Sequence, residues 1–167
     1  MNINTSVVQR LRDALLDEAR SAGAQQPLAS SDDVSGQHQA LLERFTPFAE
    51  TMFLVVIADG DEDPSELDAL RGAMHMLTAD QLSDDVLTDI FQRCRHNVAE
   101  FGVQRYIEMI GARLVGDRLD RETAFTLAAA VAMADDRVHG AEADILESIA
   151  EYFGISSSAS RRLLEEI

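Results

Sequence analysis

The sequence predicts an all-α fold: a compact bundle of about seven helices with an internal two-fold repeat of helical hairpins, plus an N-terminal helical arm. Apolar residues recur at steps of three and four, which is the spacing of one helix face. No stretch of strand length alternates β-branched and polar residues, and proline occurs only at positions 27, 47 and 64. The 167 residues are 46% hydrophobic, which is enough for one domain with its own core.

A first helix is expected after the possible caps Asn4, Thr5 and Ser6, and it is expected to end near Ala22–Gly23. Its apolar stripe consists of Val7, Val8, Leu11, Leu15 and Ala19. Residues 24–37 have the composition of a linker. We therefore divide the chain into residues 1–37, an N-terminal helix with a flexible linker, and residues 38–167, the main helical domain. The N-terminal helix is expected to dock on its own domain or on a second copy, where it would form a homodimer.

The main domain is expected to contain seven short helices. They are placed near residues 38–58, 64–78, 83–97, 103–116, 121–135, 141–153 and 158–166. Helices of this length are stabilised mainly by packing of their apolar faces, so a compact bundle is the expected arrangement. The alanine-rich helix near 121–135 is expected to be buried.

The charge balance restricts the classes of partner. The chain has 30 acidic and 14 basic residues, which gives a formal net charge of −16. Such a field repels phosphate backbones and anionic membranes, and it favours cations and basic protein surfaces. The most apolar runs, 52–58 and 124–134, are shorter than the ~20 residues of a membrane span. With no secretory signal visible, we expect a cytoplasmic protein that binds neither nucleic acid nor membrane.

Cys94 is the only cysteine, which rules out an internal disulfide and a thiolate metal cage. Two interpretations remain for it. The neighbouring Arg93 and Arg95 could lower its pKa and make it reactive. The alternative is a small residue packed inside a helix bundle.

An internal repeat is the most informative pattern. A shift of 76 positions (135 minus 59) aligns residues 55–59 with 131–135, and 66–70 with 142–146. Six aligned positions are identical, namely Val, Ala, Asp, Glu, Asp and Leu. Each half then reads as an apolar helix, an acidic turn and a second helix opened by a glutamate. A duplicated hairpin explains the matching acidic positions.

Helix termination and helix capping explain most residues of the first acidic turn. Gly60 suits the left-handed position that ends a helix. Asp63, Pro64 and Glu66 have the pattern of an N-cap, a first helical residue and a capping-box partner. The charges at 61–62 are expected to be solvated loop charges.

Helix termination and capping explain Asp59 and Asp135 less well. Each follows the end of an apolar helix, where the helix dipole disfavours an anion by roughly 0.3–1 kcal/mol. One interpretation is that each caps the next helix or pairs with an arginine such as Arg137. The other is that a bound cation reverses the electrostatic balance.

The first turn is not an EF-hand. Asp59, Asp61 and Asp63 occupy loop positions one, three and five. Position six should be glycine and is Pro64, and position twelve should be glutamate and is Leu70. A metal site would therefore need a different geometry, which could combine the two turns.

A bundle that brings the two turns together would place Asp59, Glu66, Asp135 and Glu142 at one site. Oxygen ligands of this kind suit Mg²⁺, Ca²⁺ or Mn²⁺. His139 could add a nitrogen ligand and admit Zn²⁺, or it could be a surface residue at a helix start.

No assembled catalytic constellation is visible in the sequence. We therefore expect a non-enzymatic protein. Two alternatives are a metal-dependent hydrolase that uses the same carboxylates and a plain acidic scaffold that docks on a basic partner. Among the other histidines, His75 is expected to flank the core and His96 to pair with Glu100.

Two segments resemble the TerB-like family of tellurite-resistance-associated proteins. They are Met52–Leu77 and Phe125–Ile155, each with an apolar helix ending in Ala-Asp and a glutamate opening the next helix. The second turn departs from the family pattern, because Asp136 replaces a glycine and His139-Gly140 replaces the usual polar cap. The resemblance implies an all-helical fold with pseudo-symmetric halves, an acidic cluster proposed to bind metal, and a bacterial stress-response or adaptor role.

Overall fold

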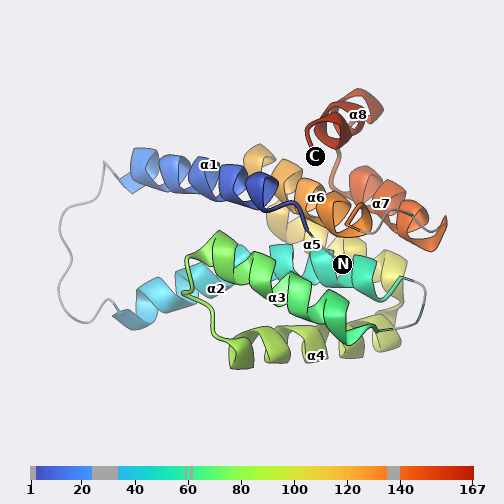
Figure 1. Cartoon of the computed structure of the whole chain (residues 1–167), viewed down its shortest axis with the longest axis horizontal. Helices are drawn as coiled ribbons and strands as arrows, with labels where there is room; N and C mark the ends of the chain where they lie inside the picture. The colour runs from blue at the N-terminus through green and yellow to red at the C-terminus, as the bar shows by residue number, and fades with distance from the viewer. Residues whose placement is uncertain (1–2, 24–33, 59, 61, 135–139) are drawn as a thin grey trace.

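A computed structural model describes residues 3–23, 34–58, 60, 62–134 and 140–167. Within these ranges the chain forms eight helices and no strand (Figure 1). The helices are α1 (Thr5–Gly23), α2 (Val34–Val56), α3 (Pro64–Thr78), α4 (Asp84–Phe101), α5 (Val103–Leu114), α6 (Arg118–Ala132), α7 (Gly140–Tyr152) and α8 (Ser157–Glu165). The predicted all-α fold and each predicted helix are confirmed.

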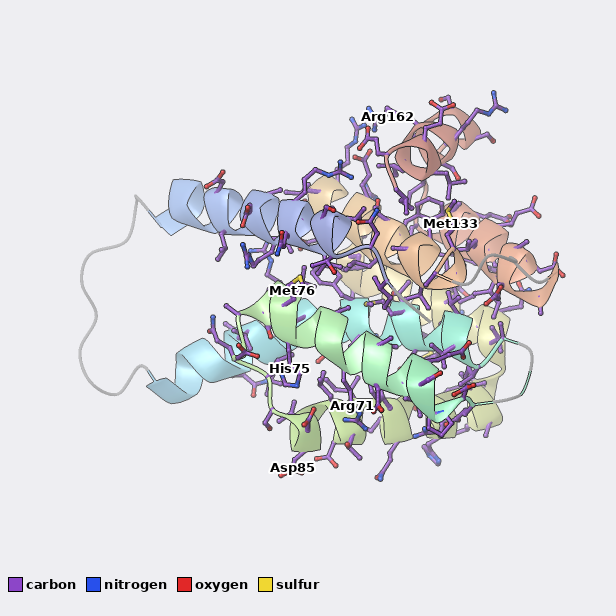
Figure 2. All side chains as sticks on the ribbon, viewed as in Figure 1. Arg71, His75, Met76, Asp85, Met133 and Arg162 are labelled. Atoms are coloured by element: carbon purple, nitrogen blue, oxygen red, sulfur yellow. The ribbon has the colours of Figure 1, made fainter. Side chains whose placement is uncertain are left out.

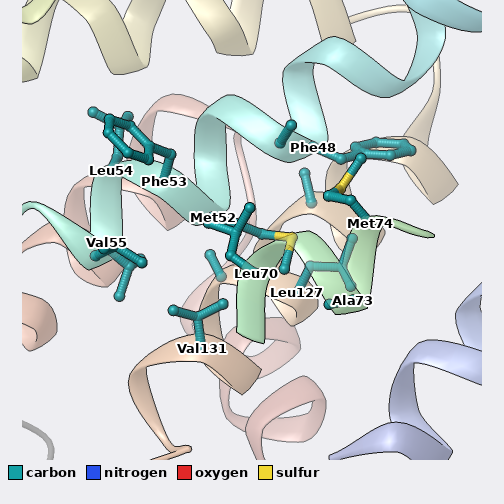
Figure 3. Packing of buried hydrophobic residues seen from close by; sticks show 14 of the residues in the cluster. Phe48, Met52, Phe53, Leu54, Val55, Leu70, Ala73, Met74, Leu127 and Val131 are labelled. Atoms are coloured by element: carbon teal, nitrogen blue, oxygen red, sulfur yellow. The ribbon is translucent and has the colours of Figure 1, made fainter. Parts of the chain in front are cut away.

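Helices α2 and α6 form the centre of the bundle and pack against each other. On α2, the side chains of Phe48, Met52 and Phe53 are completely buried (Figure 3). On α6, every residue from 123 to 132 is buried, and alanine is the commonest residue among them. Small side chains let two helix axes approach closely, and a helix that is apolar on all sides must be enclosed by others. The burial of the alanine-rich helix is confirmed.

The helix ends follow from local chemistry. The side chain of Asp117 accepts hydrogen bonds from the backbone N–H groups of Leu119 and Asp120, and so caps α6. Ser83 caps α4 through the N–H of Val86 in the same way. Such caps satisfy donors that have no partner inside the helix. Ser83 lies at the predicted start of its helix, whereas α6 begins at Arg118, three residues before the predicted start at 121.

Helix α1 docks on its own chain. Its apolar stripe faces α3 and α6, and Val7, Val8 and Leu15 are buried there. The Asn4 side-chain amide donates a hydrogen bond to the Ile167 carbonyl at 2.8 Å, which ties the two ends of the chain together. The described part of the stripe, up to Leu15, is therefore covered within the chain. A homodimer through this helix stays a prediction, and it would require α1 to exchange between copies.

The predicted linker is longer than the structure allows. Residues 34–37 were expected in it, but α2 begins at Val34. A helix, once nucleated, extends through residues of modest propensity such as Ser35 and Gly36. The linker-like composition of residues 34–37 therefore did not predict that they form the first turn of α2.

The helix boundaries follow the offset of the predicted repeat. Helix α2 ends at 56 and α6 at 132, whereas α3 begins at 64 and α7 at 140, and both intervals are 76 residues. This agreement is what a duplicated hairpin would produce, and the duplication itself stays a prediction. No helix in the described part of the chain is long and apolar enough to span a membrane.

Candidate functional site

The two acidic turns follow the central helices. The first connects α2 to α3 and the second connects α6 to α7. Helix α2 packs on α3, α6 and α7, and α6 also packs on α7. Viewed as in Figure 1, the last turns of α2 and α6 and the first turns of α3 and α7 lie toward the right-hand end of the bundle. We refer to this region as the acidic corner.

Three of the five predicted ligands lie outside the described residues. They are Asp59, Asp135 and His139. The other two are in place at the helix starts: Glu66 lies in the first turn of α3 and Glu142 in the first turn of α7, and both are half-buried. Among the residues that the structure describes, no group of three acidic, histidine or cysteine side chains is arranged to hold a metal. Convergence of the four carboxylates therefore stays a prediction.

Gly60, Asp63 and Pro64 have the helix-terminating and helix-capping roles predicted for them. Gly60 has a φ of 83°, in the left-handed region that glycine reaches without strain. Asp63 caps α3: its carboxylate accepts a hydrogen bond from the Ser65 N–H at 2.7 Å, and Pro64 is the first helical residue. These hydrogen bonds from the backbone and hydroxyl of Ser65 hold the pKa of Asp63 below its ordinary value. The Asp63 carboxylate therefore serves as the N-cap of α3.

Glu62 corrects the expectation of a solvated loop charge. Its two carboxylate oxygens accept hydrogen bonds from the Arg95 guanidinium at 2.7 and 2.5 Å. The same guanidinium lies over the Phe53 ring, 4.8 Å from the ring centroid. Hydrogen bonding to Arg95 holds the pKa of Glu62 below its ordinary value. A bidentate pair on an aromatic platform fixes both charges, so the first turn is anchored to α4.

The Arg95 anchor is the feature of this region that sequence reasoning missed. The sequence predicted for Arg95 only an effect on the pKa of the neighbouring Cys94. Its contacts to Glu62 and Phe53 depend on α4 packing against α2, and no periodicity in the sequence marks them. The sequence offered one indication of such a pair: the loop is acidic and the chain has few arginines that could neutralise it.

Cys94 is a packed core residue. Its side chain is completely buried. Burial raises the pKa of the Cys94 thiol, and the negative charge of Glu50 acts in the same direction. Arg95 turns toward Glu62, so it does not activate the thiol enough to offset burial. The reactive interpretation is wrong, and the packed interpretation is confirmed.

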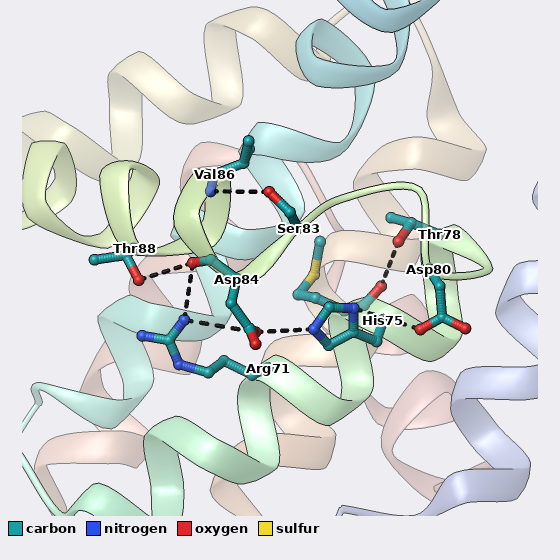
Figure 4. A network of polar contacts seen from close by, with 9 residues as sticks. Arg71, His75, Thr78, Asp80, Ser83, Asp84, Val86 and Thr88 are labelled. Atoms are coloured by element: carbon teal, nitrogen blue, oxygen red, sulfur yellow. Dashed lines mark hydrogen bonds and ion pairs between the residues drawn. The ribbon is translucent and has the colours of Figure 1, made fainter.

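His75 and His96 each lie close to a carboxylate. His75 Nε2 lies 2.9 Å from a carboxylate oxygen of Asp84, and Arg71 donates a hydrogen bond to the Asp84 carbonyl at 3.1 Å (Figure 4). The contact with His75 holds the pKa of Asp84 below its ordinary value. This network joins α3 to α4, and His75 is half-buried beside the core, as predicted. His96 lies 3.3 Å from Glu100 one turn later, which confirms that pair.

Comparison with known proteins identifies one family. The model of the tellurite resistance protein TerB family matches residues 48–165, from the middle of α2 to the end of α8. Helix α1 and the first turns of α2 lie outside that match. No curated protein and no solved structure matches the chain. Since the family model covers more than half of the sequence, the chain belongs to the tellurite resistance protein TerB family.

Proposed function

We propose that this chain is a non-enzymatic TerB-family module that holds a divalent cation between its two acidic turns and presents the loaded corner to a basic protein partner. The proposed ligands are Asp59, Glu66, Asp135 and Glu142, with His139 added when the cation is Zn²⁺. The tellurite resistance description of the family favours a stress-response or adaptor role, which we place in the cytoplasm.

One observation supports the proposal most directly. The helices flanking the two turns end and begin at matching intervals of 76 residues, and they pack on one another. Any side chain placed by the first turn is therefore expected to have a counterpart placed by the second. The paired aspartates and glutamates of the repeat are such counterparts.

The electrostatics of the helix ends favour a cation at this position. A carboxylate at the C-terminal end of a helix is disfavoured by the helix dipole, so Asp59 and Asp135 gain from a positive ion. Glu66 and Glu142 lie in the first turns of the next helices, where the dipole favours a negative charge. Carboxylate oxygens select Mg²⁺, Ca²⁺ or Mn²⁺. Glu62 is excluded from the ligand set because Arg95 holds both of its oxygens.

Thermal unfolding of the full chain after chelation, repeated with each of MgCl₂, CaCl₂, MnCl₂ and ZnCl₂, tests the proposal. A cation bound only by the folded state stabilises it by about 2.7 kcal/mol at a hundred times its Kd. The melting temperature should rise with concentration for at least one cation. In the Asp59→Asn/Asp135→Asn variant this rise should disappear.

The matched control is Asp89→Asn, which removes an exposed acid from α4, away from the acidic corner. It makes the net charge less negative by one unit without changing the proposed ligands, and it should retain the cation response. Equal responses in the wild type, the double variant and the control would mean that the cations act on the overall charge, and the proposed site would be rejected.

A further inference from the structure

An apolar groove with a volume of about 800 Å³ lies between α7 and α8. Its floor is formed by α6 and the residue that follows it, together with the facing sides of α7 and α8. The apolar lining includes Phe125, Met133, Ala143, Leu146, Ala150, Ile155 and Leu164. In Figure 2, the labelled Met133 lies in the space between α7 and α8.

The chain builds this groove by turning sharply after α7. Gly154 has a φ of 65°, and the Ile155 N–H donates a hydrogen bond to the Ala150 carbonyl at 2.8 Å, which closes the end of α7. Ser156 then caps α8. Helix α8 packs on α6 and buries only Leu163, so its side facing α7 stays open. The groove is therefore a consequence of the α7–α8 turn.

The groove exposes apolar surface that the bundle could have covered. Met133, which lines the groove, is 46% exposed. Single exposed apolar residues are ordinary, but a contiguous apolar hollow with a polar rim is typical of a binding surface. A methionine in such a place adapts its shape to an occupant.

The rim has charges without partners in the described part of the chain. Glu147 and Glu151 lie one turn apart on the exposed side of α7, and Arg161 lies on α8 across the groove. None of the three forms an ion pair with another described residue. Arg162, the next residue along α8, does pair with Glu122 at 3.5 Å. The rim of the groove therefore carries two carboxylates on α7 and one guanidinium on α8.

We propose that this groove binds an amphipathic helix of a partner protein, with its apolar stripe on the groove floor and lysine or arginine residues along the edge that faces Glu147 and Glu151. Two helices flanking an apolar floor form the kind of groove that accepts a third helix. The i, i+4 spacing of Glu147 and Glu151 matches basic residues one turn apart on the occupant. Complementary charge would set the orientation of the helix and speed its association with this acidic chain.

This inference goes beyond the proposed cation site and does not depend on it. The described residues that line the groove are not among the proposed ligands. The two proposals can therefore fail separately.

Fluorescence anisotropy with three labelled synthetic peptides of about 15 residues tests the docking proposal. The first has leucine at every third or fourth position and lysines along one flank. The second has glutamates in place of the lysines, and the third has the composition of the first in scrambled order. The basic peptide should bind about fivefold to tenfold more tightly than the acidic one, because each exposed charge pair contributes up to about 1 kcal/mol. The scrambled peptide should not bind in the same range.

The decisive variant is Glu147→Lys/Glu151→Lys, which should reverse the preference between the basic and acidic peptides while retaining the fold, since both side chains are exposed. The matched control is Asp89→Lys/Glu108→Lys, which changes the net charge equally on the exposed faces of α4 and α5. It should keep the wild-type preference. A Leu164→Asp variant, folded by circular dichroism, should bind neither peptide.

Three outcomes would overturn the docking proposal. The scrambled peptide could bind as tightly as the amphipathic one, or the two charge-reversal variants could behave alike. Sedimentation could also show that the chain self-associates and that Leu164→Asp abolishes this, which would make a second copy the occupant. Unchanged cation titrations in the Glu147→Lys/Glu151→Lys variant, with unchanged peptide binding in the Asp59→Asn/Asp135→Asn variant, would separate the two sites.

Discussion

Arg44 and Asp120 form an ion pair at 3.2 Å between the two central helices, and they are 76 residues apart in the sequence. That separation equals the offset that aligns the two acidic turns. When two similar units are related by a two-fold axis, equivalent positions near the axis meet each other. The pair therefore links the predicted repeat to the way α2 and α6 pack.

The Asp120 carboxylate should make stability depend on pH. Burial raises the pKa of Asp120 above its ordinary value of 3.8, although Arg44 acts in the opposite direction. The folded state then holds its proton to higher pH than the unfolded state, so stability falls as the pH rises from 3.8 through the folded pKa. The Asp120→Asn variant should lack this fall. Urea unfolding across the acid range checks it, and parallel curves for the two proteins would contradict the prediction.

Gly111 should not tolerate a side chain. A Cβ atom at this position would lie 2.9 Å from the Tyr152 carbonyl oxygen and 3.0 Å from the Phe153 ring. Overpacking of this kind costs about 1–3 kcal/mol, so the Gly111→Ala variant should unfold at lower denaturant concentration. Gly72 is the matched control, because it lies inside α3 with open space around it. Gly72→Ala should stabilise by about 0.5–1 kcal/mol, and destabilisation by both substitutions would contradict the steric argument.

The Glu62–Arg95 pair should contribute stability at neutral pH and lose it in acid. The folded-state pKa of Glu62 is lowered from 4.5, so its contribution is present above 4.5 and is lost as the pH falls through the folded pKa. Glu62→Gln should destabilise by up to about 1 kcal/mol at pH 7, and less in acid. Glu108→Gln, which removes a more exposed carboxylate paired with Arg105, should have a smaller effect. Unfolding at two pH values measures both. Cation titrations of Glu62→Gln should match the wild type.

In the ion pair between Glu50 and Arg113, one partner is buried and the other reaches solvent, so removal of Arg113 should destabilise the fold. Glu50 is 4% exposed, whereas the Arg113 side chain is 42% exposed. Arg113→Ala leaves a buried carboxylate without its partner and should cost about 3 kcal/mol, the lower end of the range for buried pairs, because Arg113 reaches solvent. Adding Glu50→Gln should recover part of the loss. Chemical denaturation of the two single variants and the double variant measures the coupling, and additive losses would contradict it.

The Cys94 thiol should report on opening of the core. Because it is completely buried and burial raises its pKa, a disulfide reagent should react with it only when α4 opens. The labelling rate should therefore rise with urea well below the unfolding midpoint. A cysteine at exposed position 89 of the same helix, in the Asp89→Cys variant, should react at once. Equally fast labelling of both thiols would show that Cys94 is accessible in the folded protein.

Much of the acidic corner could be predicted from local sequence. The capping role of Asp63, the first helical position of Pro64 and the left-handed Gly60 depend only on residues a few positions apart. The role of Glu62 could not be predicted in this way. Its partner Arg95 is distant in the sequence and reaches it only because α4 packs on α2.

The sequence by itself determined the helices and most of their ends, because hydrophobic periodicity and capping are properties of neighbouring residues. It also carried the resemblance to the TerB family, in the residues of the two hairpins. Only the tertiary structure decided that α1 covers α3 and α6, that Cys94 is enclosed, and that α7 and α8 leave a groove between them. Each of these depends on which faces meet across the bundle. Many faces of similar apolarity compete for those contacts, so packing of the whole chain selects among them.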